Sequence, residues 1–229
     1  MTPPAVHAAP SIQRKAVYPS NVVQCRGANP KKPKYLLSEF AVEVQQTVAD
    51  HFHIPRKAFR LKEHHSSDFI VSAVAQEVLF KKIEDPILSL DRERFEREHP
   101  DISLSEIAAS VKDVNGLTTE EISGSGDAYR IVHVRQVESS KKMKCTLIHE
   151  ALHAYSHNGF KVRCGKDLDE GVTELLAMEV IKAMGLSETR DKMGVYKTER
   201  TAATAYIRQH GIDNVKAAYF NGTFAAGMP

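Results

Sequence analysis

Two histidines and a glutamate lie close together in the segment His149-Glu150-Ala151-Leu152-His153. On a helix, residues four positions apart project from the same face, so the two imidazoles can reach one metal ion. Glu150 follows the first histidine directly and is suited to accept a proton from a metal-bound water. The segment therefore predicts a catalytic metal helix. The alternative is an ordinary helix that carries two histidines, because so short a pattern also occurs by chance.

A catalytic zinc ion takes three protein ligands and keeps a fourth position for water, so a third ligand is expected. Glu170 lies in a second segment of helical period, which starts near Leu168 and ends at Gly185. Asp167 or Asp169 is expected to cap this helix, which would place Glu170 in its first turn. A carboxylate at this position can face the two histidines.

Glu174 lies one helical turn after Glu170, so its carboxylate points the same way. Zinc-bound imidazoles usually donate their second N–H group to a carboxylate, and Glu174 has the spacing to accept this bond from His149. We therefore expect zinc to be bound by His149, His153 and Glu170, with Glu174 behind His149. The alternative for Glu174 is a solvated helix face.

Residues 148–154 and 168–171 together resemble the gluzincin metallopeptidases, in which two histidines of one helix and a glutamate of the next hold zinc. In that family an Asn often precedes the ligand glutamate, and Asp169 replaces it here. The resemblance covers residues 116–222. It implies a zincin-like fold, a zinc-dependent peptidase activity, a protein or peptide substrate, and Glu150 as the catalytic base.

Other metal-binding side chains lie near these segments. On a continuous helix His157 would lie two turns from His149, too far along the axis to share one ion, and it is interpreted as a polar residue at the helix end. Cys164 lies in the expected loop between the two helices and has no cysteine partner at metal-binding spacing. Adjacent side chains point in different directions, so His64 and His65 are interpreted as a polar loop rather than a second metal site.

The transition state of a zinc-assisted hydrolysis carries a negative oxygen, which needs a hydrogen-bond donor besides the metal. Four residues of the catalytic region are candidates for this donor: Tyr155, Tyr196, Tyr206 and His210. The sequence leaves the choice among them open. For each of the four, a role in packing or on the surface is the alternative.

Residues 128–135 alternate polar and apolar side chains and are rich in β-branched types, which predicts a strand. In zincin-like folds a strand at this place forms the edge above the cleft and can pair with an extended substrate through backbone hydrogen bonds. An internal strand is the alternative. The preceding turn at 123–126 is not a phosphate loop, because no Gly-Lys-Ser/Thr follows it.

The fold class expected from these patterns is α+β, a mainly helical zincin-like domain with a small sheet and an active-site helix. Residues 35–115 are expected to form a helical N-terminal region, which begins with an amphipathic helix at 37–52 and continues in further helices between 68 and 111. Residues 116–229 are expected to form the catalytic region. It should close with a pair of helices joined at Gly211.

The first thirty-four residues differ from the rest, because they carry six prolines and no sustained apolar period. This composition predicts a disordered leader or delivery arm, and it lacks the apolar core of a secretory signal. Residues 11–15 and 22–26 resemble leaders of cargo of bacterial extracellular contractile injection systems. The resemblance implies an effector or toxin made in a bacterial cytoplasm and then secreted or injected, with an injection system or another secretion apparatus as partner. A plain disordered tail and a pro-segment are the alternatives.

Composition excludes some classes of function. The chain has 229 residues, of which 42% are hydrophobic, enough for a substantial core. Its 31 basic and 29 acidic side chains give a net charge of +2, which argues against nucleic acid as the main partner. No apolar run is long enough to span a membrane. The three widely spaced cysteines do not form a disulfide framework, so reduced thiols are expected.

Hydrolysis of peptide bonds by a zinc-bound water, with Glu150 as the base, is the activity expected from these observations. A metal-dependent amidase or deacetylase acting on a non-peptide substrate would use the same ligands and is one alternative. The other is a non-catalytic interaction module in which zinc is structural. A closed structural site prefers four protein ligands and cysteine, so the predicted three-ligand set favours catalysis.

Overall fold

The computed structural model describes residues 37–65, 114–122, 128–193 and 196–229, with the single residues 97, 100 and 109. The chain divides into two units, residues 1–34 and 35–229. The leader expected at 1–34 and the helices expected between 68 and 111 lie almost entirely outside the described residues. The helices and strands that the structure describes belong to the second unit.

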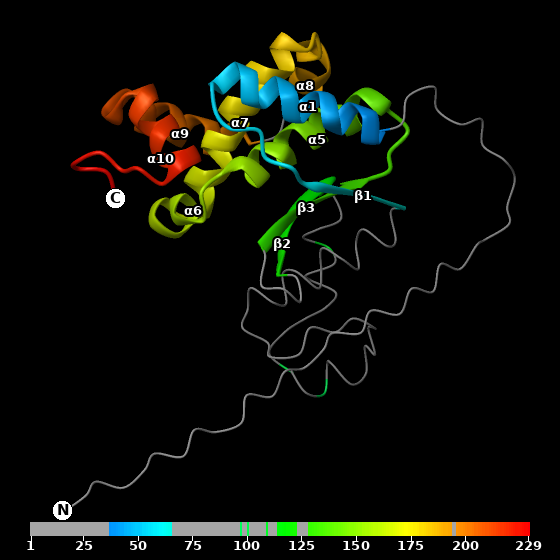
Figure 1. The fold of residues 1–229 in the computed structure, drawn as a ribbon, viewed down its shortest axis with the longest axis horizontal. Coiled ribbons are helices and arrows are strands. Elements are labelled where there is room, and N and C mark those ends of the chain that lie inside the picture. The colour runs from blue at the N-terminus through cyan, green and yellow to red at the C-terminus, as the bar shows by residue number, and fades with distance from the viewer. Residues whose placement is uncertain are drawn as a thin grey trace, which may run out of the picture. The chain divides into compact units, whose positions relative to one another are not determined.

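The described part of this unit is mainly helical and contains one small sheet, which confirms the α+β class (Figure 1). Its helices are α1 (Leu37–Phe52), α5 (Ser140–Tyr155), α6 (Asn158–Cys164), α7 (Lys166–Ala183), α8 (Ser187–Met193), α9 (Lys197–His210) and α10 (Ile212–Asn221). Its strands are β1 (Arg60–His64), β2 (Gly116–Ile122) and β3 (Ala128–Arg135). The amphipathic helix at 37–52, the strand at 128–135 and the closing helical pair are thus confirmed. None of the described helices is long and apolar enough to cross a bilayer.

In the sheet, β3 is the central strand, with β1 parallel on one side and β2 antiparallel on the other. The expectation that residues 128–135 form the sheet edge above the cleft is therefore wrong. Both edges of β3 are paired with strands that the sequence did not reveal. β1 has the sequence Arg-Leu-Lys-Glu-His, is mostly exposed and lacks an apolar alternation, so nothing in its pattern distinguished it from the helices expected in this region.

His64 belongs to β1 rather than to a polar loop. Its ring stacks on that of His133 in β3 with the centroids 5.0 Å apart, and its Nε2 lies 2.8 Å from His133 Nδ1. The other ring nitrogen of His133 is 3.0 Å from Thr119 Oγ1 in β2, so a polar chain crosses all three strands. Burial first, and the neighbouring His64 next, lower the pKa of His133 to about 4. Within the described part of the chain, this pair is in no group of three possible metal ligands.

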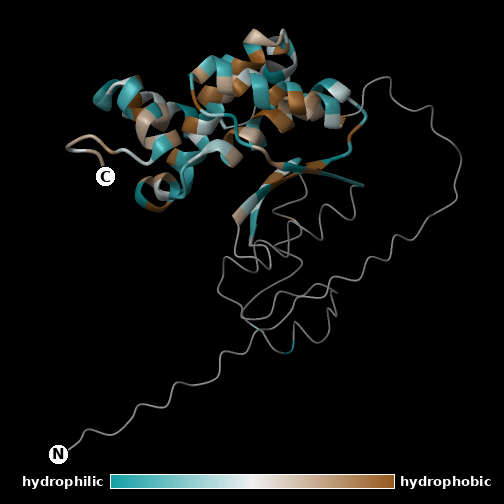
Figure 2. Ribbon diagram, viewed as in Figure 1, coloured by the Kyte–Doolittle hydropathy of each residue, from teal (hydrophilic) through white to brown (hydrophobic). Residues whose placement is uncertain are grey.

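The core lies between α5, the sheet and the helices α1 and α7. Val132 and Val134 of β3 point into it, and α5 is buried along most of its length because the sheet covers one side and α1, α7 and α8 contact the others. Figure 2 shows apolar colour along β3 and on turns of the helices above it. The helix that carries the two histidines is therefore fixed from several directions.

A close helix contact brings α9 beside α7. At Gly171 of α7 a Cβ atom would collide with the backbone carbonyl of Glu199 and would lie 3.0 Å from Ala203 Cβ. Glycine permits this approach because it has no side chain. The contact holds the start of α9, and with it Tyr196, near the N-terminal half of α7, where Glu170 lies.

Candidate metal centre

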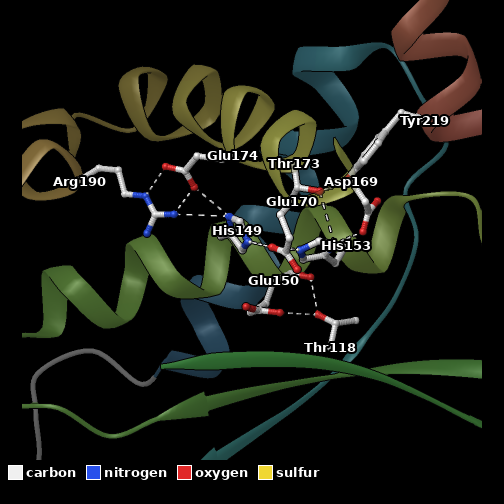
Figure 3. A network of polar contacts seen from close by, with 10 residues as sticks. All are labelled: Thr118, His149, Glu150, His153, Asp169, Glu170, Thr173, Glu174, Arg190 and Tyr219. Carbon is white, nitrogen blue, oxygen red and sulfur yellow. Dashed lines mark hydrogen bonds and ion pairs between the residues drawn. The ribbon is translucent and has the colours of Figure 1, made fainter. Parts of the chain in front are cut away.

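The three side chains predicted to bind metal, those of His149, His153 and Glu170, converge between α5 and α7 (Figure 3). His149 and His153 lie one turn apart on α5, with their ring centroids 5.0 Å apart. Oε2 of Glu170 on α7 lies 3.3 Å from Nε2 of His149 and 3.2 Å from Nε2 of His153. The donor atoms of the three residues lie within 4.8 Å of one another, so the group could hold a metal ion.

The start of α7 differs from the prediction. The helix begins at Lys166 directly after Gly165, and Asp167 and Asp169 lie in its first turn, so neither is the N-cap. Glu170 is consequently one residue beyond the first turn. Gly165 adopts a φ of 84°, which ends α6 and lets α7 begin at once without a side-chain cap. The expected loop between the histidines and Glu170 is thus largely the helix α6, and Cys164 is its last residue.

Glu174 lies behind His149, and an arginine that the sequence analysis missed lies behind Glu174. Oε2 of Glu174 is 2.9 Å from His149 Nδ1. Arg190 of α8 donates to both carboxylate oxygens of Glu174, with Nε 2.8 Å from Oε1. The side chains of Arg190 and Glu174 are only 5% and 1% exposed. Burial lowers the pKa of His149, but its hydrogen bonds to the two glutamates outweigh burial and raise it.

His153 also has a carboxylate partner, which the sequence analysis considered only as a helix cap. Oδ2 of Asp169 and Oγ1 of Thr173 each lie 3.4 Å from His153 Nδ1, and Thr173 Oγ1 is 2.7 Å from the hydroxyl of Tyr219. Burial lowers the pKa of His153, but Asp169 and Glu170 outweigh it and raise the pKa to about 10. Both imidazoles thus present Nε2 to Glu170 and Nδ1 to a second carboxylate.

Glu150 lies on α5 beside the three possible ligands and faces β2. It is 6% exposed, and Thr118 Oγ1 of β2 lies 3.0 Å from its Oε2 and 2.8 Å from its backbone oxygen. Burial raises the pKa of Glu150 above that of an exposed glutamate. A carboxyl group with a raised pKa binds a proton more readily than an exposed one, which suits a general base.

Three of the four candidates for the oxyanion donor make contacts away from His149 and His153. They are Tyr155, Tyr206 and His210. The hydroxyl of Tyr155 is 2.9 Å from the backbone oxygen of Gln45, inside the core. Tyr206 contacts His210, with ring centroids 4.5 Å apart, and its hydroxyl lies 3.6 Å from Cys164 Sγ. These contacts agree with the alternative interpretation of the three residues, a role in packing or on the surface.

Tyr196 is the candidate that reaches the site. Its ring stacks on the imidazole of His149, with centroids 4.8 Å apart and an angle of 7° between the planes. Its φ of 56° is a left-handed conformation that residues other than glycine seldom adopt and that is enriched at functional sites. Burial raises the pKa of Tyr196, and the carboxylates of Glu170 and Glu150 raise it further, so its hydroxyl keeps its proton.

His157 takes the polar helix-end role expected for it. It precedes α6 as the N-cap, and its Nδ1 accepts a hydrogen bond of 3.1 Å from the backbone N–H of Gly159. The ring also packs against Gly222, where a Cβ atom would lie 2.6 Å from the imidazole. His157 is therefore outside the possible metal-binding group.

Negative charge exceeds positive charge around the two imidazoles. Glu150, Asp169, Glu170 and Glu174 contribute four carboxyl groups. Two guanidinium groups contact the histidines, that of Arg190 at His149 Nδ1 and that of Arg130 at the backbone oxygen of His153. An excess of buried negative charge is costly unless protons or a cation offset it. The carboxylates of Glu170, Glu174 and Asp169 raise the pKa of the imidazoles despite burial, because a proton bound there offsets part of this charge. A divalent cation at the same place would have the same effect.

Comparisons of the chain with models of protein families, with curated proteins and with solved structures found no match. What the site can do is therefore inferred from its own side chains. They offer two imidazole nitrogens and one carboxylate oxygen to a metal ion, and they place a buried carboxyl group, Glu150, next to it.

Proposed function

We propose that the protein is a zinc-dependent metallopeptidase of zincin-like fold. The observation that carries the proposal is the convergence of His149 Nε2 and His153 Nε2 on Glu170 Oε2. Two imidazoles and one carboxylate are a ligand set of catalytic zinc, which keeps a further position for water. The carboxylates at both Nδ1 atoms support this choice of metal, because such partners orient zinc-bound imidazoles.

Zinc, when bound, lowers the pKa of a water molecule to about 7 and polarises the carbonyl group of the scissile bond. Glu150 accepts the proton of this water and passes it to the leaving amine. Its burial supports this role, because a carboxyl group in an apolar environment has a raised pKa and holds the proton between the two transfers. Hydrolysis then needs no covalent intermediate with a serine, threonine or cysteine.

Tyr196 is proposed to donate a hydrogen bond to the oxyanion that forms on the substrate. Its ring lies against His149, and its hydroxyl keeps its proton because burial and two nearby carboxylates raise its pKa. A neutral phenol is a suitable donor to developing negative charge. Its left-handed backbone supports the assignment, because strained conformations are retained where function requires them.

An extended peptide is the proposed substrate, and β2 takes the place that residues 128–135 were expected to have. Among the described strands, β2 is an outer strand of the sheet, and its residue Thr118 contacts Glu150. A peptide that pairs with an outer strand is recognised through its backbone, so the side chains of the substrate can vary. A secreted or injected effector is the biological setting we propose, on the resemblance of the leader alone.

The proposal is tested by measuring zinc content and cleavage together. Wild-type protein and the Glu150→Gln variant, purified in parallel, should each contain about one zinc per chain, as catalytic sites do. Peptides released from a mixed proteome should appear with wild type and disappear with the variant. Zinc in both proteins without cleavage by either would favour the structural module. Cleavage of acylated or amidated small molecules without peptide products would favour the amidase or deacetylase.

A further inference from the structure

β2 runs along the metal helix with one face towards it. Alternate residues of β2 share the face of Val132 and Val134, which point into the core, because Gly116 pairs with Val134 and Thr118 with Val132. Gly116 and Thr118 thus both face α5. The strand is far from Glu150 in the sequence, but both residues contact this side chain.

Thr118 binds Glu150 at two points. Its Oγ1 lies 3.0 Å from Oε2 of the carboxyl group and 2.8 Å from the backbone oxygen of the same residue. The side chain of threonine is stiff because it is branched at Cβ. The hydroxyl therefore ties one carboxylate oxygen to the helix backbone and leaves the other, Oε1, outside this contact.

Gly116 leaves the space in which Glu150 lies. A Cβ atom at this position would be 2.5 Å from Glu150 Cγ, 2.7 Å from Glu150 Oε1 and 2.6 Å from Thr146 Cγ2. Real Cβ atoms do not approach other atoms so closely, so alanine would force Glu150 or the strand to move. Gly116 is not among the described glycines with a positive φ, so the requirement for glycine here is one of space.

We propose that Gly116 and Thr118 are positioning residues for Glu150: the glycine makes room for the side chain and the threonine hydroxyl fixes its Oε2. The inference rests on the proposed function of Glu150 as the base. It extends that function by naming the groups that hold the base at a single orientation. In this role both residues act through Glu150.

The hydroxyl of Thr118 serves Glu150 before and after the proton transfer. A hydroxyl carries one proton and two acceptor lone pairs. It donates to Oε2 when Glu150 is ionised. When Glu150 holds the proton, the hydroxyl donates to the backbone oxygen and accepts from Oε2 instead. One residue can therefore hold the carboxyl group in either protonation state, because Thr118 Oγ1 lies within hydrogen-bond distance of both oxygens.

Steady-state kinetics with zinc-loaded full-length protein test the inference. Thr118→Val keeps the shape of the side chain without the hydroxyl, and we expect kcat to fall about tenfold to a hundredfold with KM unchanged, the loss typical of a misplaced catalytic group. Thr118→Ser should restore kcat because it restores the hydroxyl. Gly116→Ala should lose kcat at least as strongly. Thr119→Val is the matched control, since Thr119 is the next residue on the opposite face of β2 and contacts His133.

A second measurement does not depend on activity. In protein labelled with ¹³C at glutamate Cδ, the resonance that disappears in Glu150→Gln belongs to Glu150. We expect it to shift in metal-free Thr118→Val and to stay in place in Thr119→Val. An unshifted resonance together with unchanged kcat in Thr118→Val would overturn the inference. If wild type hydrolyses no peptide, the proposed function fails, while a shifted resonance would still support the positioning of Glu150 by Thr118.

Discussion

Replacing Glu174 by alanine should both destabilise the protein and weaken its metal binding. In the native structure Glu174 pairs with Arg190 and accepts from His149. Alanine would leave the guanidinium of Arg190, whose side chain is 5% exposed, without this carboxylate. It would also leave His149 Nδ1 without the group that orients the ring.

The magnitude follows from the burial of the pair. Removing one partner of a buried ion pair costs roughly 3–5 kcal/mol, because the remaining charge is left in a medium of low polarity. For a folded unit spanning residues 35–229, this corresponds to a fall in Tm of roughly 6–20 °C. Loss of the carboxylate behind His149 should weaken zinc binding by about 10–100-fold.

Urea unfolding of the metal-free protein, in the presence of a chelator, measures the first effect. Competition with a chromophoric chelator measures the second. The double variant Glu174→Leu/Arg190→Met separates them. It removes both charges and keeps apolar volume, so its stability should return close to that of wild type. Its zinc affinity should stay as low as that of Glu174→Ala, since His149 still lacks its partner.

Two results would refute this reasoning. A loss of less than about 1 kcal/mol in Glu174→Ala would show that the ion pair is exposed enough for water to replace the carboxylate, as at surface pairs. Recovery of zinc affinity in the double variant would show that Glu174 acts on the metal site only through the fold. The imidazole of His149 would then be oriented by other contacts.

Three further predictions concern the metal, the pH and the leader. His153→Ala should lower the zinc content, measured by elemental analysis, from about one ion per chain to nearly none. Unchanged zinc content, or zinc binding that depends on His157 or Cys164, would contradict the ligand assignment. The pKa of His133 is lowered from 6.5 to about 4 in the folded protein, so between these pH values the unfolded chain binds one more proton at this residue. The free energy of unfolding should therefore fall as the pH decreases from 6.5 to 4, by at most about 3 kcal/mol. Urea unfolding at pH 7 and pH 4 measures this loss, and His133→Gln should reduce it. A protein that starts at Tyr35 should keep its zinc, Tm and peptidase rate but lose export or packaging; a higher rate would indicate a pro-segment, and unchanged transport would rule out delivery.

The sequence by itself determined the elements whose signal is local. The spacing of His149 and His153 places them on one helix face, and the helical period after Leu168 turns Glu170 and Glu174 towards the same side. The alternation at 128–135 and the apolar period at 37–52 also depend only on neighbouring residues, and the strand and the helix are both present. These patterns could be recognised because each element carries its own repeat.

The helix boundaries around Glu170 were less predictable. Asp167 and Asp169 have the residue type of an N-cap, but the chain ends α6 with the left-handed Gly165 and starts α7 directly. Acidic residues are favoured both at the cap and in the first turn, so residue type alone does not distinguish the two positions.

Only the tertiary structure decided which groups surround the site. The contact of Thr118 with Glu150, the pairing of Arg190 with Glu174 and the stacking of Tyr196 on His149 each join residues of different elements. No local period encodes such contacts, because they depend on how strands pair and helices pack. The strand order has the same physical reason. β3 is internal because β1 and β2, whose sequence patterns are weak, pair with its two edges, and β2 is therefore the outer strand beside Glu150.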